Sequence, residues 1–572
     1  MTHADLILTG GPVLGPDGHP RHGLAVAARD GRIVALVPEH DAPDLRGPRT
    51  EIVDLHGRLL LPGFVDAHAH PVWGGLERLA CDLLDAPRTV ADYQRRIADC
   101  AVAHPEWPWI SGGGWSFEAF PNGRATTAML DAVVRERPVV LVNRDHHGVW
   151  VNSRALREAG IDAATPDPPD GRIERDSTGA PSGVLHEGAV ALVADLLPPP
   201  DAELLDAALD EARRRLVPLG ITGWVDAILG DYVGQPDPLP AYLRAAASGR
   251  LDVRATGALW WDRTRGVEQI GDLLARQRQA TQAGFPTPFV KIMADGIVEN
   301  QTAALLEDYL DRDGTPAGQR GISFVPREAL LEALPALERA GFGVHVHAIG
   351  DRAVRDTLDA VARARADRQS TGRPAPLVPH QIAHLQIVTP ADVPRFGALG
   401  VVATCQALWA CNEPQMVEFT LPLLGNPRQT WQYPFAAIAA AGGRLALGSD
   451  WPVSSPDPWQ AVHVAVTRAL PDEPPDERPD EPPDEPPDER DVEPFLPEQS
   501  LTLEAALHAA TAGSAFAAGL DDVGRIERGA RADLVVASLD PFTVAPRDLA
   551  AVHTDLVVLG GRVVAASGAL TD

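Results

Sequence analysis

Residues 59–70 have the sequence Leu-Leu-Leu-Pro-Gly-Phe-Val-Asp-Ala-His-Ala-His. An apolar run that ends directly in two histidines is typical of a buried strand that carries a pair of ligands at its end. In extended backbone, residues two apart point to the same side, so His68 and His70 can reach one metal ion. Two polar histidines satisfied by other hydrogen bonds are the alternative, and this pair alone does not exclude it.

Apolar runs like the first one, over 59–65, recur along the middle of the chain. They alternate with stretches rich in Ala, Leu and Arg that are typical of helices. The further runs lie at 221–226, 253–259, 289–293, 343–347, 381–385, 400–404 and 444–447. Eight such strands, each followed by helical sequence, predict an α/β fold, the (β/α)8 TIM barrel.

The two ends of the chain differ from the middle. Both contain short apolar runs separated by Gly, Pro and Asp, a pattern typical of small antiparallel strands. Gly560-Gly561 predicts a hairpin turn in the last of them. We therefore expect residues 1–58 and 511–572 to form one composite β-sandwich domain beside a barrel that spans residues 59–510.

Two segments interrupt the barrel pattern. We interpret residues 71–199 as an insertion at the barrel mouth, where long loops usually carry substrate contacts. Residues 471–493 are a repeat of Pro and acidic residues, with 12 acidic residues and 2 arginines. Such a composition cannot bury apolar area and predicts a disordered loop, with an acidic docking segment as the alternative.

The 572 residues carry a formal charge of -29, of which -10 belongs to residues 471–493. A negative field repels phosphate backbones, so we exclude nucleic acid as a partner. No apolar run approaches the roughly 18 residues that a membrane helix requires, which predicts that the chain does not span a membrane. The four cysteines form no Cys-x-x-Cys pair, and the first residues lack the features of a leader, so we expect a cytoplasmic protein.

Three further strand ends carry side chains that commonly bind metals. His345 and His347 fall on one face of the fifth strand, His384 ends the sixth, and Asp450 follows the eighth. Any one of them could instead be a buried polar group bonded to a backbone carbonyl. Four strands with such side chains at their carboxyl ends predict a metal site at the mouth of the barrel.

The fourth strand carries Lys291, the one lysine among 50 basic residues. Arginine stays protonated, whereas a desolvated lysine can lose its proton and add carbon dioxide. The resulting carbamate has two oxygens that can bridge two metal ions. A Schiff base would also need a lysine but leaves the histidines and Asp450 unexplained. A core lysine paired with Asp295 is the structural alternative.

Longer motifs extend this pattern over almost the whole chain. They lie at 114–115, 130–132, 145–156, 183–187, 290–296 with 302–304, 347–354, 448–453 and 529–536. With these motifs the chain resembles the amidohydrolase superfamily, in the family 3 branch that includes N-substituted formamide deformylase. The implied ligands are His68, His70 and Asp450 for one ion, His347 and His384 for a second, and carboxylated Lys291 as the bridge. His345 matches no ligand position and is expected to be structural.

The resemblance implies a metal-dependent hydrolase that cleaves a non-peptide carbon–nitrogen bond, with an N-substituted amide or formamide as substrate. Asp450 and Lys291 are the expected catalytic residues. Asp450 would take the proton of the attacking hydroxide and pass it to the departing amine, while Asp295 would orient a ligand. Two divalent ions and carbon dioxide are the expected cofactors, with zinc as the metal and manganese or iron as alternatives.

Two other functions stay open at this point. A deaminase of a heterocyclic substrate would direct the same activated water to an amidine-like carbon. A non-catalytic barrel scaffold would be marked by missing ligands, and in this sequence all of them are present. The expected partner is a small amide-type molecule, and the oligomeric state is left open, with a homodimer as one assembly.

Trp115, His147 and Trp409 are the candidate substrate contacts, and Trp73 and Trp150 are further aromatic residues near the mouth. For each tryptophan, packing in a core is the alternative. The residues around His147 depart from the family pattern, which tends to have Gly before this histidine and Ser after it.

Overall fold

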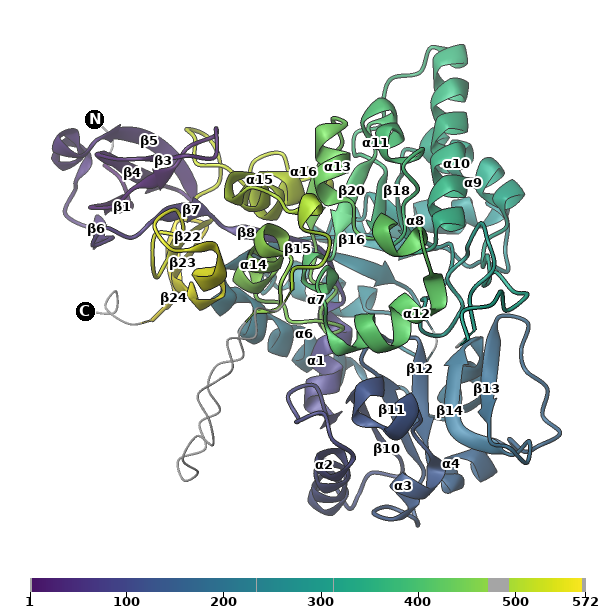
Figure 1. The fold of residues 1–572 in the computed structure, drawn as a ribbon. Coiled ribbons are helices and arrows are strands. Elements are labelled where there is room, and N and C mark those ends of the chain that lie inside the picture. Colours follow the sequence, from purple (N-terminus) through teal and green to yellow (C-terminus); the bar gives the residue numbers. More distant parts are fainter. Residues whose placement is uncertain (1–2, 233, 312, 472–492, 568–572) are drawn as a thin grey trace.

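Eight parallel strands form the centre of the computed structural model, which describes residues 3–232, 234–311, 313–471 and 493–567 (Figure 1). The strands are β8 (Phe64–Ala69), β15 (Ile221–Leu229), β16 (Arg254–Trp260), β17 (Phe289–Met293), β18 (Gly343–Ala348), β19 (Gln381–His384), β20 (Val402–Cys405) and β21 (Arg444–Leu447). Each is paired with the next in this order, and each overlaps one of the predicted runs. The predicted eight-stranded α/β barrel is confirmed.

Hydrogen bonds bring the last strand back to the first. In the segment that follows β21, the Asp450 N–H donates to the His68 carbonyl at 2.7 Å, and the Ser449 N–H donates to Asp66 Oδ1 at 3.0 Å. In return, the His70 N–H donates to the Trp451 carbonyl at 2.8 Å. The carboxyl ends of β8 and β21 are therefore fixed side by side.

Helices follow most of the strands and cover the outside of the barrel. They are α6 (Ala202–Leu216), α7 (Leu239–Ala247), α8 (Ile270–Ala283), α9 (Arg327–Arg339), α10 (Asp351–Thr371), α11 (Val393–Leu399), α13 (Phe435–Ala440) and α14 (Pro458–Thr467). Helix α6 begins where the Asp201 carboxylate accepts a hydrogen bond from the Leu204 N–H. Its buried side chains include Leu205, Leu209 and Leu216, whose spacing places one apolar face against the barrel.

The run predicted as one strand over 59–65 is split in two. Leu60–Pro62 forms β7, which pairs with a strand near the C-terminus, and the barrel strand β8 begins only at Phe64. Gly63 lies at the break, and a Cβ added there would lie 2.2 Å from the Thr222 hydroxyl. Because only glycine fits this close approach, the chain can turn from one sheet into the next at this point.

Strands from both ends of the chain pair with one another. The first sheet contains β1 (Leu6–Thr9), β4 (Leu24–Arg29), β5 (Arg32–Pro38) and β6 (Glu51–Asp54). The second contains β2 (Val13–Leu14), β3 (Pro20–Arg21), β7, β22 (Leu534–Ala537), β23 (Thr554–Leu559) and β24 (Arg562–Ala566). Leu8 and Val26 of the first sheet share a hydrophobic cluster with Val536 and Val558 of the second. The composite of both ends is observed, and its status as a separate sandwich domain stays a prediction.

Residues 511–523 lie with the barrel rather than with the terminal sheets, although the C-terminal part was expected to begin at 511. Helix α16 (Ser514–Ala517) packs against the barrel strands, where Ala517 contacts Ala67. The side-chain amide of Gln381, on β19, donates to the Ala517 carbonyl at 2.8 Å. This helix therefore covers the end of the barrel at which the strands begin.

The expected insertion over 71–199 has a sheet of its own, drawn in blue in Figure 1. Its strands are β9 (Cys81–Asp82), β10 (Ile110–Trp115), β11 (Val139–Asn143), β12 (Gly148–Val151), β13 (Gly171–Arg175) and β14 (Pro181–Glu187). Trp115 and Trp150 pack at its centre with Phe120. The insertion thus has its own hydrophobic core.

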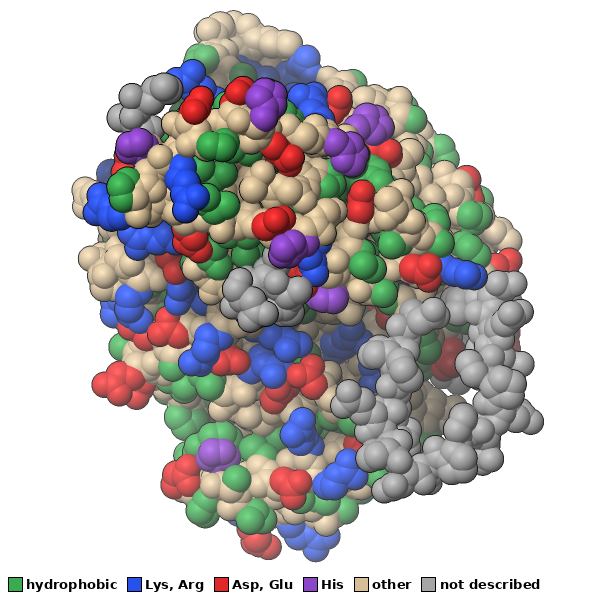
Figure 2. All heavy atoms as spheres, turned by 90° about the vertical axis from the view of Figure 1, so that its left-hand side faces the viewer, with side chains coloured by type: hydrophobic (Ala, Val, Ile, Leu, Met, Phe, Trp, Pro, Cys, Tyr) green, Lys and Arg blue, Asp and Glu red, His purple; other side chains and the backbone are tan. Residues whose placement is uncertain are grey.

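The acidic, Pro-rich loop predicted over 471–493 lies, apart from its two end residues, outside the described residues. Within the described part of the chain, none of the helices has the length and apolar character needed to cross a bilayer. Figure 2 shows acidic and basic side chains interspersed over the face that the terminal strands present. Two of the ion pairs of these strands are Arg32 with Asp522 and Arg58 with Asp555, each at 2.8 Å.

Candidate metal centre

The two histidines of β8 and the aspartate after β21 converge. The Nε2 atoms of His68 and His70 lie 3.3 and 3.0 Å from Asp450 Oδ1. Potential ligand atoms of the three side chains all lie within 4.8 Å of one another, and all three residues are buried. The prediction that the strand ends bring them together agrees with this geometry.

The other three predicted ligands surround the same point. Lys291 Nζ, on β17, lies 3.3 Å from His68 Nε2. The rings of His347 and His384, from β18 and β19, have their centres 4.3 Å apart, and His384 Nδ1 lies 3.8 Å from Asp450 Oδ2. All six residues line one cavity of about 110 Å³.

Several buried atoms of this group lack hydrogen bonds to any described residue. They are both ring nitrogens of His384, Nδ1 of His70, and Oδ1 of Asp450, which faces two histidine nitrogens without hydrogen-bond geometry. Buried polar atoms usually have partners. Imidazole and carboxylate donors that point at one space fit divalent cations such as zinc, manganese or iron.

Burial favours the ligand forms of these side chains. It holds the pKa of His347 and of His384 well below the usual value of 6.5, so both rings are neutral and have a free lone pair. It also lowers the pKa of Lys291 from 10.5 to about 7. Burial alone would raise the pKa of Asp450, but His68 and its neighbours keep that pKa well below 3.8. The aspartate is therefore ionised.

Two buried side chains, Asp66 and His345, contact the predicted ligands and their neighbours from behind. Asp66 Oδ1 accepts hydrogen bonds from the N–H groups of His68 and Ser449, at 3.1 and 3.0 Å. His345 Nε2 lies 2.6 Å from His68 Nδ1, so it orients this predicted ligand and leaves its Nε2 without that contact. The expectation that His345 is structural agrees with this contact.

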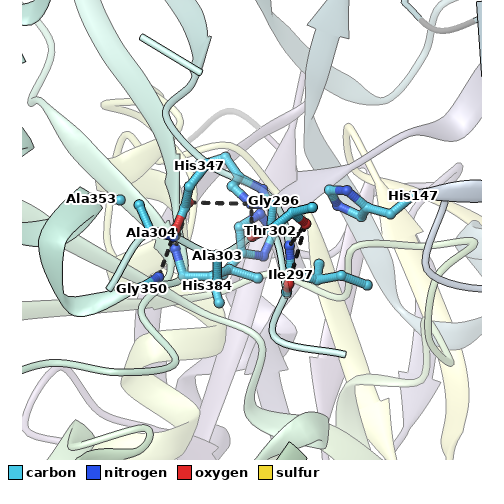
Figure 3. A network of polar contacts seen from close by, with 12 residues as sticks. His147, Gly296, Ile297, Thr302, Ala303, Ala304, His347, Gly350, Ala353 and His384 are labelled. Carbon is cyan, nitrogen blue, oxygen red and sulfur yellow. Dashed lines mark hydrogen bonds and ion pairs between the residues drawn. The ribbon is translucent and has the colours of Figure 1, made fainter. Parts of the chain in front are cut away.

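Asp295 shapes the loops around His347. Its carboxylate accepts hydrogen bonds from the N–H groups of Ala304 and Gly350, both at 2.8 Å, and of Ile349, at 3.0 Å. Figure 3 shows His347 and His384 near Ala304 and Gly350, and His347 Nε2 lies 3.4 Å from the Gly296 carbonyl. Asp295 is not paired with Lys291 in the described structure; instead it holds the backbone on both sides of His347.

His147 reaches the cavity from the insertion. Its Nδ1 lies 3.0 Å from both carboxylate oxygens of Glu187, and its ring centre is 5.5 Å from that of His347 (Figure 3). Burial lowers the pKa of His147, but the Glu187 carboxylate more than compensates and raises it to about 9. Thr302 Oγ1 donates to Glu187 Oε1 at 2.8 Å. The imidazole ring of His147 is therefore a cation that Glu187 fixes at the edge of the candidate metal site.

The sequence did not single out Glu187 as a partner of His147, because 40 residues separate them. The register of the insertion's sheet would have revealed the contact. Strands β12 and β14 are antiparallel, and Gly148 is paired with His186, the neighbour of Glu187. Arg144, in the turn before β12, also lines the cavity and was not predicted.

The predicted aromatic contacts fall into two groups. Trp409 is half-buried, lines the cavity and stacks on His384 with ring centres 5.4 Å apart; Trp73 stacks on His70 at 4.9 Å. Trp115, by contrast, is fully buried in the core of the insertion, where its indole N–H donates to the Leu141 carbonyl at 2.8 Å. Trp115 does not line the cavity, so the structure does not bring it to the site.

Comparisons with known proteins show the family and the fold of this chain. Residues 51–565 match the family model described as amidohydrolase family. The chain is 28% identical over 560 residues to protein LONG AFTER FAR-RED 3 of Arabidopsis thaliana, covering 96% of this chain and 89% of that one. It is 24% identical over 554 residues to N-substituted formamide deformylase of Arthrobacter pascens, covering 95% of each. An uncharacterized metal-dependent hydrolase from Pyrococcus horikoshii OT3 has the same fold, with a TM-score of 0.69 at 21% identity over 95% of this chain and 99% of that one.

Proposed function

Because the chain belongs to the amidohydrolase family and is a metal-dependent hydrolase of carbon–nitrogen bonds, we propose that its substrate is an N-substituted amide or formamide. The observation that carries the proposal is the convergence of all six ligand side chains with the His147 cation on one cavity. A carbonyl group bound in that cavity would lie between the six proposed metal ligands and the N–H donor of His147. This arrangement suits attack on a carbonyl carbon.

The ligands divide into two sets. His68, His70 and Asp450 would hold one divalent ion, and His347 and His384 would hold a second. Zinc is the proposed metal because imidazole nitrogens dominate the donor set. When bound, the ions would supply an activated hydroxide and would polarise the carbonyl oxygen.

Lys291 is proposed to become a carbamate, whose two oxygens would help to hold the ions. Its neutral amine attacks the carbon of carbon dioxide, a carbon–nitrogen bond forms, and the nitrogen loses one proton to solvent. The buried position of the amine, with a pKa of about 7, supports a neutral nucleophile near physiological pH. Arginine could not take part in this reaction, because it remains protonated.

Asp450 and His147 are proposed to act on the substrate from opposite sides. The ionised Asp450 carboxylate would take the proton of the attacking hydroxide and deliver it to the nitrogen of the departing amine. His147 Nδ1 is bonded to Glu187, which leaves Nε2 of this cavity-lining ring for a ligand. That N–H is therefore left to donate to the carbonyl oxygen, and the half-buried ring of Trp409 offers an apolar face to the rest of the substrate.

A substrate panel with zinc-loaded protein tests the proposal. The panel contains N-benzylformamide, N-benzylacetamide and an amino-substituted heterocycle, and formate, acetate and ammonia are measured separately. Release of formate or acetate with benzylamine supports the proposal. Ammonia from the heterocycle alone would instead identify a deaminase. A protein that holds less than one ion per chain and stays inactive after zinc and bicarbonate are added would be a scaffold.

A further inference from the structure

Arg144 lines the cavity of the metal ligands but has no part in the mechanism above. It lies between β11 and β12, in the turn that also carries His147. Its backbone N–H donates to the Trp115 carbonyl at 2.7 Å, and its Nε donates to the Val453 carbonyl at 2.9 Å. The side chain is thereby fixed between the insertion and the loop that follows Asp450.

The Arg144 guanidinium has no ion pair and no hydrogen bond from its two terminal nitrogens to any residue that the structure describes. Glu413 and Glu118 act on it only through longer-range attraction. Two other part-buried arginines, Arg58 and Arg254, each have a carboxylate oxygen at 2.8 Å. Buried charges normally have such partners, so the terminal nitrogens of Arg144 are available to a ligand in the cavity.

The chemistry of that ligand follows from the guanidinium and its surroundings. A planar guanidinium binds a carboxylate through two parallel N–H donors. Glu299 and Glu413 line the same cavity and would oppose a doubly charged phosphate more strongly than a singly charged carboxylate.

We propose that Arg144 binds a free carboxylate of the substrate, and this inference rests on the proposed hydrolysis of an amide or formamide. The scissile carbonyl would lie at the ligand side chains while the carboxylate lies at Arg144, since both groups line one cavity. The substrate class is then N-formyl and N-acyl amino acids. Uncharged N-substituted amides of the same shape are the poorer substrates.

Binding is tested without turnover. The probes are 3-phenylpropanoate and its uncharged counterpart 3-phenylpropanol, and thermal shift and calorimetric titration of the zinc-loaded protein are the readouts. We expect the carboxylate to bind the wild type, and Arg144→Gln to weaken that binding by about 10- to 100-fold, as expected for a hydrogen-bonded charge pair. Arg144→Lys should be intermediate, because it keeps the charge but loses the planar fork.

Arg154→Gln is the matched control, because Arg154 is exposed and pairs with Glu158 outside the cavity. Metal content and melting temperature are measured for each variant, so that a misfolded Arg144→Gln protein is recognised and Arg144→Lys is used in its place. Equal binding of the carboxylate by wild type and by a folded Arg144 variant would overturn the inference.

Kinetics separate this inference from the proposed function. We expect wild type to prefer N-formyl-phenylalanine over N-formyl-phenylalaninamide by 10-fold or more, mainly through KM, and the Arg144 variants to lose that preference. Hydrolysis of both compounds at equal rates would overturn the carboxylate site and leave the proposed function standing. Arg144-dependent binding of 3-phenylpropanoate without hydrolysis of any amide would support the carboxylate site and refute the proposed function.

Discussion

Replacing Lys291 with arginine separates the charge of the side chain from the reactivity of its amine. Lys291 is 1% exposed, and its Nζ lies 3.3 Å from His68 Nε2. Burial lowers its pKa from 10.5 to about 7. That difference of 3.5, at 1.36 kcal/mol for each pH unit, corresponds to a penalty of about 5 kcal/mol for a protonated cation in this position.

Lysine avoids the penalty by losing its proton, whereas arginine cannot. We therefore expect Lys291→Arg to unfold about 5 kcal/mol more easily than Lys291→Met, which is similar in length and uncharged. Neither variant can form a carbamate, so both should hold fewer than two ions per chain and be inactive. Denaturant unfolding measures the first expectation, and elemental analysis with the formate assay measures the second.

Stability tests the penalty for a buried cation, and activity with metal content tests the carbamate. Equal stability of Lys291→Arg and Lys291→Met would show that burial does not penalise a cation here. An active Lys291→Arg protein with two ions would refute the carbamate. A third variant, Lys291→Ala, provides a positive control: added acetate or propionate can enter the space and supply two oxygens, so partial recovery of metal content is expected.

Substitutions at Glu187, Trp409 and Asp226 test the roles of these three side chains. Glu187→Gln removes the charge that raises the pKa of His147, so activity should fall by about 10- to 100-fold with unchanged metal content. Adding His147→Ala to this variant should reduce activity little further, because the two residues act as a pair. Additive losses of activity in the double variant would contradict the pairing. Trp409→Ala removes the ring stacked on His384, so KM for aromatic substrates should rise about 2- to 10-fold, measured against an aliphatic substrate whose KM should not change. Burial raises the pKa of Asp226 to about 8 from 3.8. The protonated form is thus favoured in the folded state, and its stabilising contribution is lost as the pH rises from about 4 to about 8. Wild type should lose stability relative to Asp226→Asn by about 1.4 kcal/mol per pH unit between pH 5.5 and 7.5 in denaturant unfolding, and parallel curves would refute this.

The barrel could be predicted from the sequence because its strands are buried on both faces. Parallel strands of this kind read as unbroken apolar runs, and a polar residue at their ends stands out. His347 and Asp450 were recognisable for this reason. The first run was misjudged because Leu60–Pro62 is as apolar as the barrel strand that follows it, although it belongs to the terminal sheet. Hydrophobicity does not distinguish two buried sheets.

The insertion's part of the site could not be predicted in the same way. His147 depends on Glu187, 40 residues away, and Arg144 depends on the Val453 carbonyl, 309 residues away. Contacts at such separations follow from how the insertion packs on the barrel. Trp115 illustrates the same difficulty, since a tryptophan that fills the insertion's own core has the same local sequence signal as one that faces a cavity.

The barrel and the insertion therefore contribute different side chains to the candidate site. The barrel supplies every proposed metal ligand, from its strands or the segments that follow them, while the insertion supplies His147 and Arg144 from one short turn. That turn contacts the loop after β21 through the bond from Arg144 to Val453, three residues beyond Asp450. Changes in the turn can thus alter which substrates bind while the proposed ligands stay in place, but they also act on the loop that carries Asp450, the proposed proton shuttle. Substitutions at Arg144 should consequently affect KM first, and kcat only where they displace the Val453 carbonyl.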